Sequence, residues 1–341
     1  MNFILAFLAA AASAALEFHP DGTFRLVQFT DLHYNYELWD GKTVDDTTLV
    51  VNVTKPDLAV LTGDITSGTT FVFQANQERK WKECVAVFQE AGVPWAMTLG
   101  NHDPDGPMTQ EELLAVDQSL NGSLSQSMAK SEEWGGLVNY YVPIYAPKHV
   151  EGDDPVALLW LFDVTLGNCM GTSGDDCVST DIIRWYRETR ELLNAKRVQA
   201  GKKNIAALAF THIPPPEMMT LWNTERCVGL RGENVCCPSN NTGLYDALAE
   251  DRSSIGLFFG HDHKNDFCGS FSENPNLLLC YGRKSGYGYY NPDHHGARVI
   301  DLTLDLSTLD VTLNTFLVDE NAKVVAQEWH EPEEEPVQTK C

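Results

Sequence analysis

Six apolar runs, five of which end in a cluster of polar residues, dominate the hydrophobic pattern of this chain. They cover residues 24–34, 56–66, 93–103, 156–164, 205–217 and 254–263. Their length and their content of β-branched and aromatic residues predict buried strands. The apolar spacing of residues 74–91 and 181–196 predicts helices between them. Alternation of strands and helices is typical of an α/β sheet, in which ligand sites lie beyond the carboxyl ends of the strands.

A different pattern follows in residues 296–319, where apolar and polar positions alternate with a period of two. This predicts antiparallel strands that close a second sheet. No internal repeat or long linker divides the chain, so we expect one domain over residues 15–325. The acidic, proline-containing residues 326–341 are expected to form a solvated tail.

The composition and the N-terminal sequence indicate the cellular compartment and exclude some classes of binding partner. The chain has 341 residues, 43% of them hydrophobic, and a net charge of −24, so we expect neither nucleic acid nor an anionic membrane as a partner. The apolar N-terminus with Ala12-Ser13-Ala14 predicts a signal peptide over residues 1–14, and no later run is long enough to span a membrane. Glycosylation sequons begin at Asn52, Asn121 and Asn240. We therefore expect a glycoprotein that is secreted or lies in an endomembrane lumen.

Nine cysteines support an oxidising compartment, where most should form disulfides. Cys169 and Cys177 bracket a short polar loop and are the local pair most easily predicted. We expect Cys84 to be a buried free thiol. An unpaired Cys341 could bridge two chains, although the sequence does not define the oligomeric state.

Residues of metal-ligand types follow five of the predicted strands. They are Asp31, His33, Asp64, Asn101, His212, His261 and His263. Any one of these clusters alone is typical of a turn or of a hydrogen-bonded histidine. Together they predict a metal centre, because histidine nitrogen and carboxylate oxygen are ligands of borderline divalent ions.

The number of these residues fits two ions that share one carboxylate. Asp64, with both oxygens free, is predicted to bridge the ions. Asp31, His33 and His263 would complete the first set of ligands, and Asn101, His212 and His261 the second. Glycines at positions 63, 100 and 260 would let the backbone turn sharply before each ligand.

In this order the motifs Asp-Leu-His, Gly-Asp, Gly-Asn-His-Asp, His and Gly-His-Asp-His resemble the calcineurin-like metallophosphoesterase superfamily. Within it, the chain is similar to single-domain relatives of purple acid phosphatases, several of which are named inactive. The resemblance implies a four-layer αββα sandwich of two mixed sheets flanked by helices. It also implies phosphoester hydrolysis by metal-bound hydroxide at two divalent or trivalent ions, namely Fe, Mn or Zn. His102 would then act on the substrate phosphate or the leaving oxygen, oriented by Asp103 or another acceptor.

The chain departs from true purple acid phosphatases at two positions. It has His33 where they have glycine, and Ser67 where they have the iron-binding tyrosine. We expect a protein that is not purple, in which His33 replaces the missing ligand.

Substrate contacts are predicted from Asn101, His102 and the loop over residues 281–296, which brings Arg283, Lys284 and Tyr287 towards the cleft. A glycine-rich hairpin without a role in binding is an equal alternative for this loop. The expected activity is that of a phosphomonoesterase on a small-molecule or protein phosphoester. Two alternatives remain, a phosphodiesterase acting on nucleotides or lipids and a non-catalytic pseudophosphatase that retains its metals.

Overall fold

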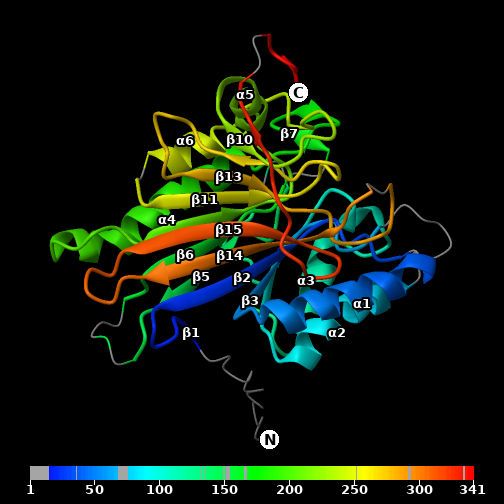
Figure 1. Cartoon of the computed structure of the whole chain (residues 1–341), viewed down its shortest axis with the longest axis horizontal. Coiled ribbons are helices and arrows are strands. Elements are labelled where there is room, and N and C mark those ends of the chain that lie inside the picture. The colour runs from blue at the N-terminus through cyan, green and yellow to red at the C-terminus, as the bar shows by residue number, and fades with distance from the viewer. Residues whose placement is uncertain are drawn as a thin grey trace, which may run out of the picture.

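The computed structural model describes residues 15–35, 37–67, 76–131, 133, 135–148, 150, 154–164, 167–250, 252–290, 293–332 and 335–341. The predicted signal peptide lies outside these residues. Two β-sheets form the centre of the molecule, with helices on both outer sides (Figure 1). This arrangement is the predicted αββα sandwich.

The smaller sheet has five strands in the order β15-β14-β2-β3-β4. Their bounds are β15 Val311–Asp319, β14 Gly296–Leu304, β2 Thr23–Phe29, β3 Leu58–Thr62 and β4 Trp95–Thr98. β2, β3 and β4 run parallel, so their carboxyl ends lie at one edge. The β14–β15 hairpin has the predicted antiparallel pairing, but it extends this sheet through β2 and does not close a separate one.

The larger sheet has nine strands in the order β1-β5-β6-β9-β11-β13-β12-β10-β16. Their bounds are β1 Leu16–Glu17, β5 Tyr140–Tyr145, β6 Ala157–Leu161, β9 Ala206–Phe210, β11 Ser254–Phe259, β13 Leu278–Tyr281, β12 Cys268–Gly269, β10 Cys227–Val228 and β16 Trp329–His330. β6, β9, β11 and β13 run parallel, which aligns their carboxyl ends too. A separate small hairpin joins β7 Asn168–Cys169 to β8 Thr172–Ser173.

Six α-helices cover the outer faces of the sheets in the described part of the chain. They are α1 Glu37–Thr54, α2 Gln77–Ala91, α3 Gln110–Gln118, α4 Thr180–Gln199, α5 Glu217–Thr224 and α6 Leu244–Ala249. Figure 1 shows α1 and α2 together on one side of the molecule and α4 and α6 on the other. The sequence predicted α2 and α4 to within about three residues. None of the described helices is both long and apolar enough to cross a membrane.

Successive side chains of the central strands point to opposite faces of the sheet, which explains how the layers pack. In β6, Leu158 and Trp160 contact the cluster that includes α4, whereas Leu159 and Leu161 join the core shared with the five-stranded sheet. All four side chains are buried. A strand with apolar residues on both faces must be covered on both sides, which is why these runs lack the alternation of a half-exposed strand.

Disulfides fasten the loops and the C-terminal segment. Cys169 pairs with Cys177 as predicted, and Cys268 pairs with Cys280. Cys84 is a buried free thiol, also as predicted. Cys341 instead pairs with Cys237, so the expectation of an unpaired C-terminal cysteine was wrong.

The described residues of the C-terminal segment are mostly exposed, and contacts with the rest of the chain hold them in place. β16 pairs with β10 in the nine-stranded sheet. The Gln338 amide accepts a hydrogen bond from Val235 N at 2.8 Å and donates one to Val235 O at 2.8 Å. Together with the disulfide of Cys341, these contacts hold the end of the chain against the loop after β10.

Candidate metal centre

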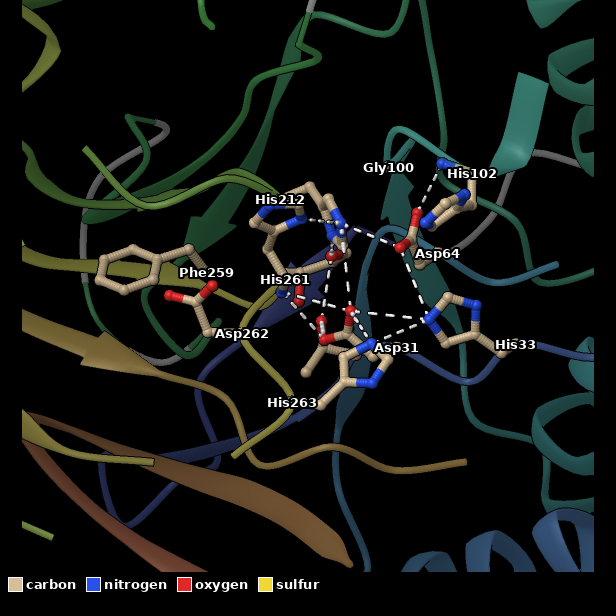
Figure 2. Close-up of polar contacts among 12 residues, drawn as sticks. Asp31, His33, Asp64, Gly100, His102, His212, Phe259, His261, Asp262 and His263 are labelled. Atoms are coloured by element: carbon tan, nitrogen blue, oxygen red, sulfur yellow. Dashed lines mark hydrogen bonds and ion pairs between the residues drawn. The ribbon is translucent and has the colours of Figure 1, made fainter. Parts of the chain in front are cut away.

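The predicted ligands lie together beyond the carboxyl ends of five strands. Asp31 and His33 follow β2, Asp64 follows β3 and Asn101 follows β4, while His212 follows β9 and His261 and His263 follow β11. Figure 2 shows the rings of His33, His212 and His263 around the carboxylates of Asp31 and Asp64. Strands of both sheets therefore supply one site.

An unusual backbone conformation recurs at this edge. The φ angles of Asp31, His33, Asp64 and His261 are 53°, 49°, 50° and 76°, in the left-handed region that residues other than glycine seldom adopt. Such strain persists only where the surrounding structure imposes it, and it is concentrated at functional sites. These φ angles turn the chain abruptly at the strand ends, which brings the side chains inward.

The glycines before the ligands act chiefly by leaving room. Only Gly63 has a positive φ, of 82°, whereas Gly100 and Gly260 do not. A Cβ at Gly100 would collide with Asp64, and one at Gly260 would collide with Thr30 and Asp31. A Cβ at Gly63 would collide with His212, so all three glycines are positions of close approach to a ligand.

The first group of ligand atoms surrounds Asp31. His263 Nε2 lies 3.4 Å from Asp31 Oδ1, and His33 Nε2 lies 3.0 Å from His263 Nε2. These three side chains offer atoms within 4.8 Å of one another, close enough to bind one ion. All three are buried.

The second group contains Asp64 and His212, which together with Asp31 offer atoms within 4.8 Å of one another. His212 Nε2 lies 3.2 Å from Asp64 Oδ2, and His261 Nδ1 lies 3.4 Å from His212 Nε2. Asp64 Oδ2 is also 3.5 Å from His33 Nε2, so this one oxygen lies between the two groups. Asp64 Oδ1 accepts the backbone N–H of His102 at 2.8 Å. Only one oxygen of Asp64 is therefore free, whereas the sequence analysis expected two.

Hydrogen bonds on the far side of the rings fix their orientation. The Nδ1–H of His212 donates a hydrogen bond to the carbonyl oxygen of Thr62 at 2.8 Å, and that of His263 donates one to the carbonyl oxygen of Tyr290 at 2.8 Å. In a neutral ring this leaves a lone pair on Nε2, directed at the carboxylates. Such Nδ1 bonds are the usual support of a metal-binding histidine. His33 has the same arrangement, with its Nδ1 2.8 Å from Ser67 Oγ.

The side chain of Asn101 gives further evidence that this site can bind a metal ion. Its Oδ1 is buried and finds no hydrogen-bond partner among the described residues. A buried carbonyl oxygen without a partner is costly, and a cation would relieve that cost. The donor set of imidazole nitrogen, carboxylate oxygen and amide oxygen suits Fe, Mn or Zn.

Burial and charge set the protonation of the cluster. Burial lowers the pKa of His33 well below its ordinary value and that of His261 to about 4, so both rings are neutral, as metal binding requires. Burial also opposes protonation of His212, but the Asp64 carboxylate outweighs it and raises the pKa of His212 to about 10. Without an ion, His212 carries the positive charge that balances Asp64.

His102 lies beside the cluster, and the structure shows what holds it. Its Nδ1 is 2.8 Å from Asp105 Oδ2, in the short 3-10 helix η2 Asp103–Asp105. Asp103 does not contact the ring. Its buried carboxylate accepts the backbone N–H of Thr66 at 2.8 Å and of Gly100 at 2.9 Å. Asp105, which the sequence analysis did not name, is thus the acceptor, and Asp103 supports the turn.

The loop predicted to bind substrate is only partly directed at the cluster. Arg283 Nη1 forms an ion pair with Asp266, and Tyr287 OH donates to Asp46 at 2.6 Å. Buried Lys284 donates from Nζ to the backbone oxygen of Asp31 at 3.0 Å, behind the ligands. These contacts give no support to a role of the three side chains at the substrate.

Two other tyrosines of this loop border the site. The Tyr289 ring stacks on His33 with centroids 5.1 Å apart and lies 4.8 Å from the ring of His102. Tyr290 stacks on His263 at 4.0 Å. Tyr289 is 42% exposed and has a φ of 63°. The sequence analysis named Tyr287 in this loop, but not the two rings that border the cluster.

Comparison with known proteins agrees with this geometry. Residues 24–265 match the family model described as calcineurin-like phosphoesterase. The chain belongs to the calcineurin-like phosphoesterase family. The match includes every predicted metal ligand, from Asp31 to His263. The expected resemblance is therefore confirmed for the family and for its fold.

Curated relatives within this family have differing names. The chain is 30% identical over 304 residues to "Probable inactive purple acid phosphatase 14" of Arabidopsis thaliana, covering 81% of this chain and 73% of the relative. It is 29% identical over 289 residues to "Phosphatase DCR2" of Saccharomyces cerevisiae, covering 77% of this chain and 48% of the relative. A dimetal phosphatase of Danio rerio has the same fold, with a TM-score of 0.57 at 14% identity over 91% of this chain and 99% of that chain.

Proposed function

We propose that this chain is an active phosphoesterase that uses two metal ions to hydrolyse phosphomonoesters. The observation that carries the proposal is Asp64 Oδ2, which lies between His33 of the first ligand group and His212 of the second. One carboxylate oxygen shared by two nitrogen-rich groups is suited to bridging a pair of ions.

The ligand set supports the two-ion arrangement expected from the sequence. The first ion would be held by Asp31, His33, Asp64 and His263, and the second by Asp64, Asn101, His212 and His261. When bound, such ions activate water at neutral pH and neutralise charge on the phosphoryl oxygens. Divalent Fe, Mn or Zn fits these ligands, and Ser67 at the tyrosine position predicts a protein without purple colour.

His102 is the group of this chain suited to proton transfer. Asp105 accepts a hydrogen bond from its Nδ1, which leaves Nε2 as the nitrogen available to the substrate. Its backbone N–H is anchored on Asp64, so the ring is fixed relative to the ligands. We infer that His102 acts as an imidazolium, in which Nδ1–H stays on Asp105 and Nε2 gives its proton to the leaving oxygen. The bond between that oxygen and phosphorus breaks as the attacking water oxygen bonds to phosphorus.

The names of the plant relatives raise the alternative of an inactive protein. That alternative would follow if the missing tyrosine left the site short of a ligand. Here His33 supplies a nitrogen instead, and Ser67, at the tyrosine position, holds its ring at 2.8 Å. The two departures from the purple enzymes therefore compensate each other.

Turnover of two chromogenic substrates by protein of known metal content tests this function. We expect hydrolysis of p-nitrophenyl phosphate to exceed that of bis(p-nitrophenyl) phosphate. The reverse ratio would make the protein a phosphodiesterase. No turnover of either ester with two ions bound would make it a pseudophosphatase.

We also propose that the protein is exported to an oxidising compartment. Three disulfides support this, as do the sequons at Asn52 and Asn121, whose side chains are exposed. Asn240 is less suited to carry a glycan, because its Nδ2 donates to Cys169 O at 3.2 Å and to Thr172 Oγ1 at 2.6 Å. N-terminal sequencing and glycosidase treatment of the secreted protein test the compartment and the sites.

A further inference from the structure

An exposed thiol lies beside the candidate metal centre. Cys236 is an exposed free cysteine, whereas the other two free cysteines of the described chain, Cys84 and Cys227, are buried. Ligand atoms of Cys236, His261 and Asp262 all lie within 4.8 Å of one another. Thiolate, imidazole and carboxylate are the side chains that bind Zn²⁺ in proteins. Cys236 and Asp262 belong to neither of the two ligand groups described above.

Hydrogen bonds fix this cluster in place. Cys236 N donates to Asp262 Oδ2 at 3.1 Å, and Tyr281 OH donates to the same oxygen at 2.5 Å. Figure 2 shows Asp262 beside His261 and directed away from Asp64. The disulfide of the next residue, Cys237, with Cys341 anchors the segment further. The thiol is thus part of a built structure and not of a freely moving loop.

The charges around Cys236 are negative. Glu233, Asp175 and Asp176 lie within electrostatic range of the thiol, in addition to Asp262. Asp175 is held there by Ser239, which donates to its Oδ2 from the hydroxyl at 2.6 Å. Acidic groups beside a site that takes an anionic ester repel the substrate, but they attract cations. The surroundings therefore attract a cation, which on binding must displace the thiol proton, because burial and these acidic groups raise the pKa of Cys236 to about 11.

We propose that Cys236, His261 and Asp262 form an accessory site for one thiophilic divalent cation, of which Zn²⁺ is the physiological type. Binding breaks the S–H bond, forms a bond between sulfur and the metal, and releases the proton to solvent. A thiolate ligand selects Zn²⁺ over Mg²⁺, Ca²⁺ or Mn²⁺.

Occupation of the accessory site lowers phosphoesterase activity, because His261 is shared with the second ligand group. An ion drawn to Cys236 competes for this ring, whose Nδ1 lies 3.4 Å from His212 Nε2. This inhibitory effect rests on the proposed function, whereas binding of the ion does not.

Cadmium is the probe, since Cd²⁺ bound to thiolate gives a charge-transfer absorption in the ultraviolet. The intact protein, loaded with its two ions, is titrated with Cd²⁺ as wild type, as Cys236→Ser and as the matched control Cys227→Ser. Cys227 is also a free cysteine, but it is buried, and its thiol donates to Leu221 O. We expect one bound Cd²⁺ and the absorption band in wild type and in the control, together with weaker retention of the second ion because His261 is shared. Cys236→Ser should lose the band and bind this Cd²⁺ at least about tenfold more weakly.

A wild-type protein without the band, or a Cys236→Ser variant that keeps it, would overturn the accessory site. Turnover of p-nitrophenyl phosphate in the same titration tests inhibition. Activity should fall with Cd²⁺ in wild type and in Cys227→Ser, and it should be insensitive to this Cd²⁺ in Cys236→Ser. Equal sensitivity of all three would overturn the regulatory effect. A protein without any turnover would refute the proposed function but leave the absorption result intact.

Discussion

The contact between His102 and Asp105 gives a prediction that the sequence alone did not supply. The His102 Nδ1 to Asp105 Oδ2 distance is 2.8 Å, and the two side chains are 18% and 42% exposed. A hydrogen bond to a charged group contributes about 1.5–3 kcal/mol when well shielded from water. Solvent screening at this exposure reduces the contribution to about 1 kcal/mol. Because 1.36 kcal/mol corresponds to a tenfold change in rate, Asp105→Ala should lower kcat about fivefold.

Three further variants separate orientation of the ring from other effects. Asp105→Asn keeps an acceptor oxygen and should lose only about half of that free energy, or about twofold in kcat. His102→Ala should lose about a hundredfold or more, because it removes the proton donor itself. Glu111→Gln, at an exposed acid of α3, makes the same charge change as Asp105→Asn and should leave kcat unchanged.

The assay is steady-state turnover of phenyl phosphate, whose leaving oxygen is more basic than p-nitrophenolate and so depends on a proton donor. Both kcat and KM are measured for each variant and for the double variant. If Asp105 acts only through His102, Asp105→Ala should have no further effect in the His102→Ala protein. A wild-type kcat in Asp105→Ala would refute the inferred contact. So would a fivefold loss that persists when His102 is absent.

Three further predictions concern other contacts. Ser67→Ala removes the hydrogen-bond partner of His33 Nδ1. The affinity for one of the two bound ions should fall about 10–100-fold in equilibrium dialysis. Equal affinities of the variant and the wild type would refute support of the ring by Ser67. Cys341→Ser removes a cross-link to Cys237, a residue 104 positions away. It should lower the free energy of unfolding by about 2–5 kcal/mol in urea titrations. An unchanged midpoint of unfolding would exclude the pairing with Cys237. Tyr289→Ala removes the exposed ring beside His33 and His102. It should raise KM for aryl phosphates but not for methyl phosphate. Equal changes in KM for the two substrates would exclude contact between Tyr289 and the organic group of the ester.

Much of the site could be predicted from the sequence because its ligands directly follow buried strands. Parallel neighbours such as β2 and β3 bring their carboxyl ends to one edge, so Asp31 and Asp64 had to lie close together. The apolar runs marked where each strand ends. What they could not reveal was the left-handed backbone at Asp31 and Asp64, because such conformations depend on the surrounding packing.

The helices show a different limit of prediction from the sequence. α1 contains Gly41 and several threonines and valines, a composition that does not favour a helix, and it is stabilised by packing against α2 and β14. α3 did carry a signal that the sequence analysis missed. Thr109 accepts from the backbone of Glu112, whose side chain accepts from the backbone of Thr109, which is a capping box readable from the sequence.

Side-chain direction in loops was the least predictable feature. Tyr287 and Tyr289 lie two residues apart, yet one bonds to Asp46 and the other borders the cluster. Tyr289 also has a positive φ, and no local pattern predicts a positive φ at a tyrosine. The Cys237–Cys341 pairing was equally hidden, because cysteine spacing does not define connectivity.

The most direct test of a two-ion phosphoesterase is turnover of p-nitrophenyl phosphate as metal is returned to chelator-treated protein. We expect no turnover without metal, little after one equivalent of Mn²⁺ or Zn²⁺, and full turnover only when the second equivalent has bound. The Asp64→Asn variant, which lacks the shared carboxylate, should stay inactive throughout. Full activity of the metal-free protein, or no turnover with two ions bound, would contradict the proposed function.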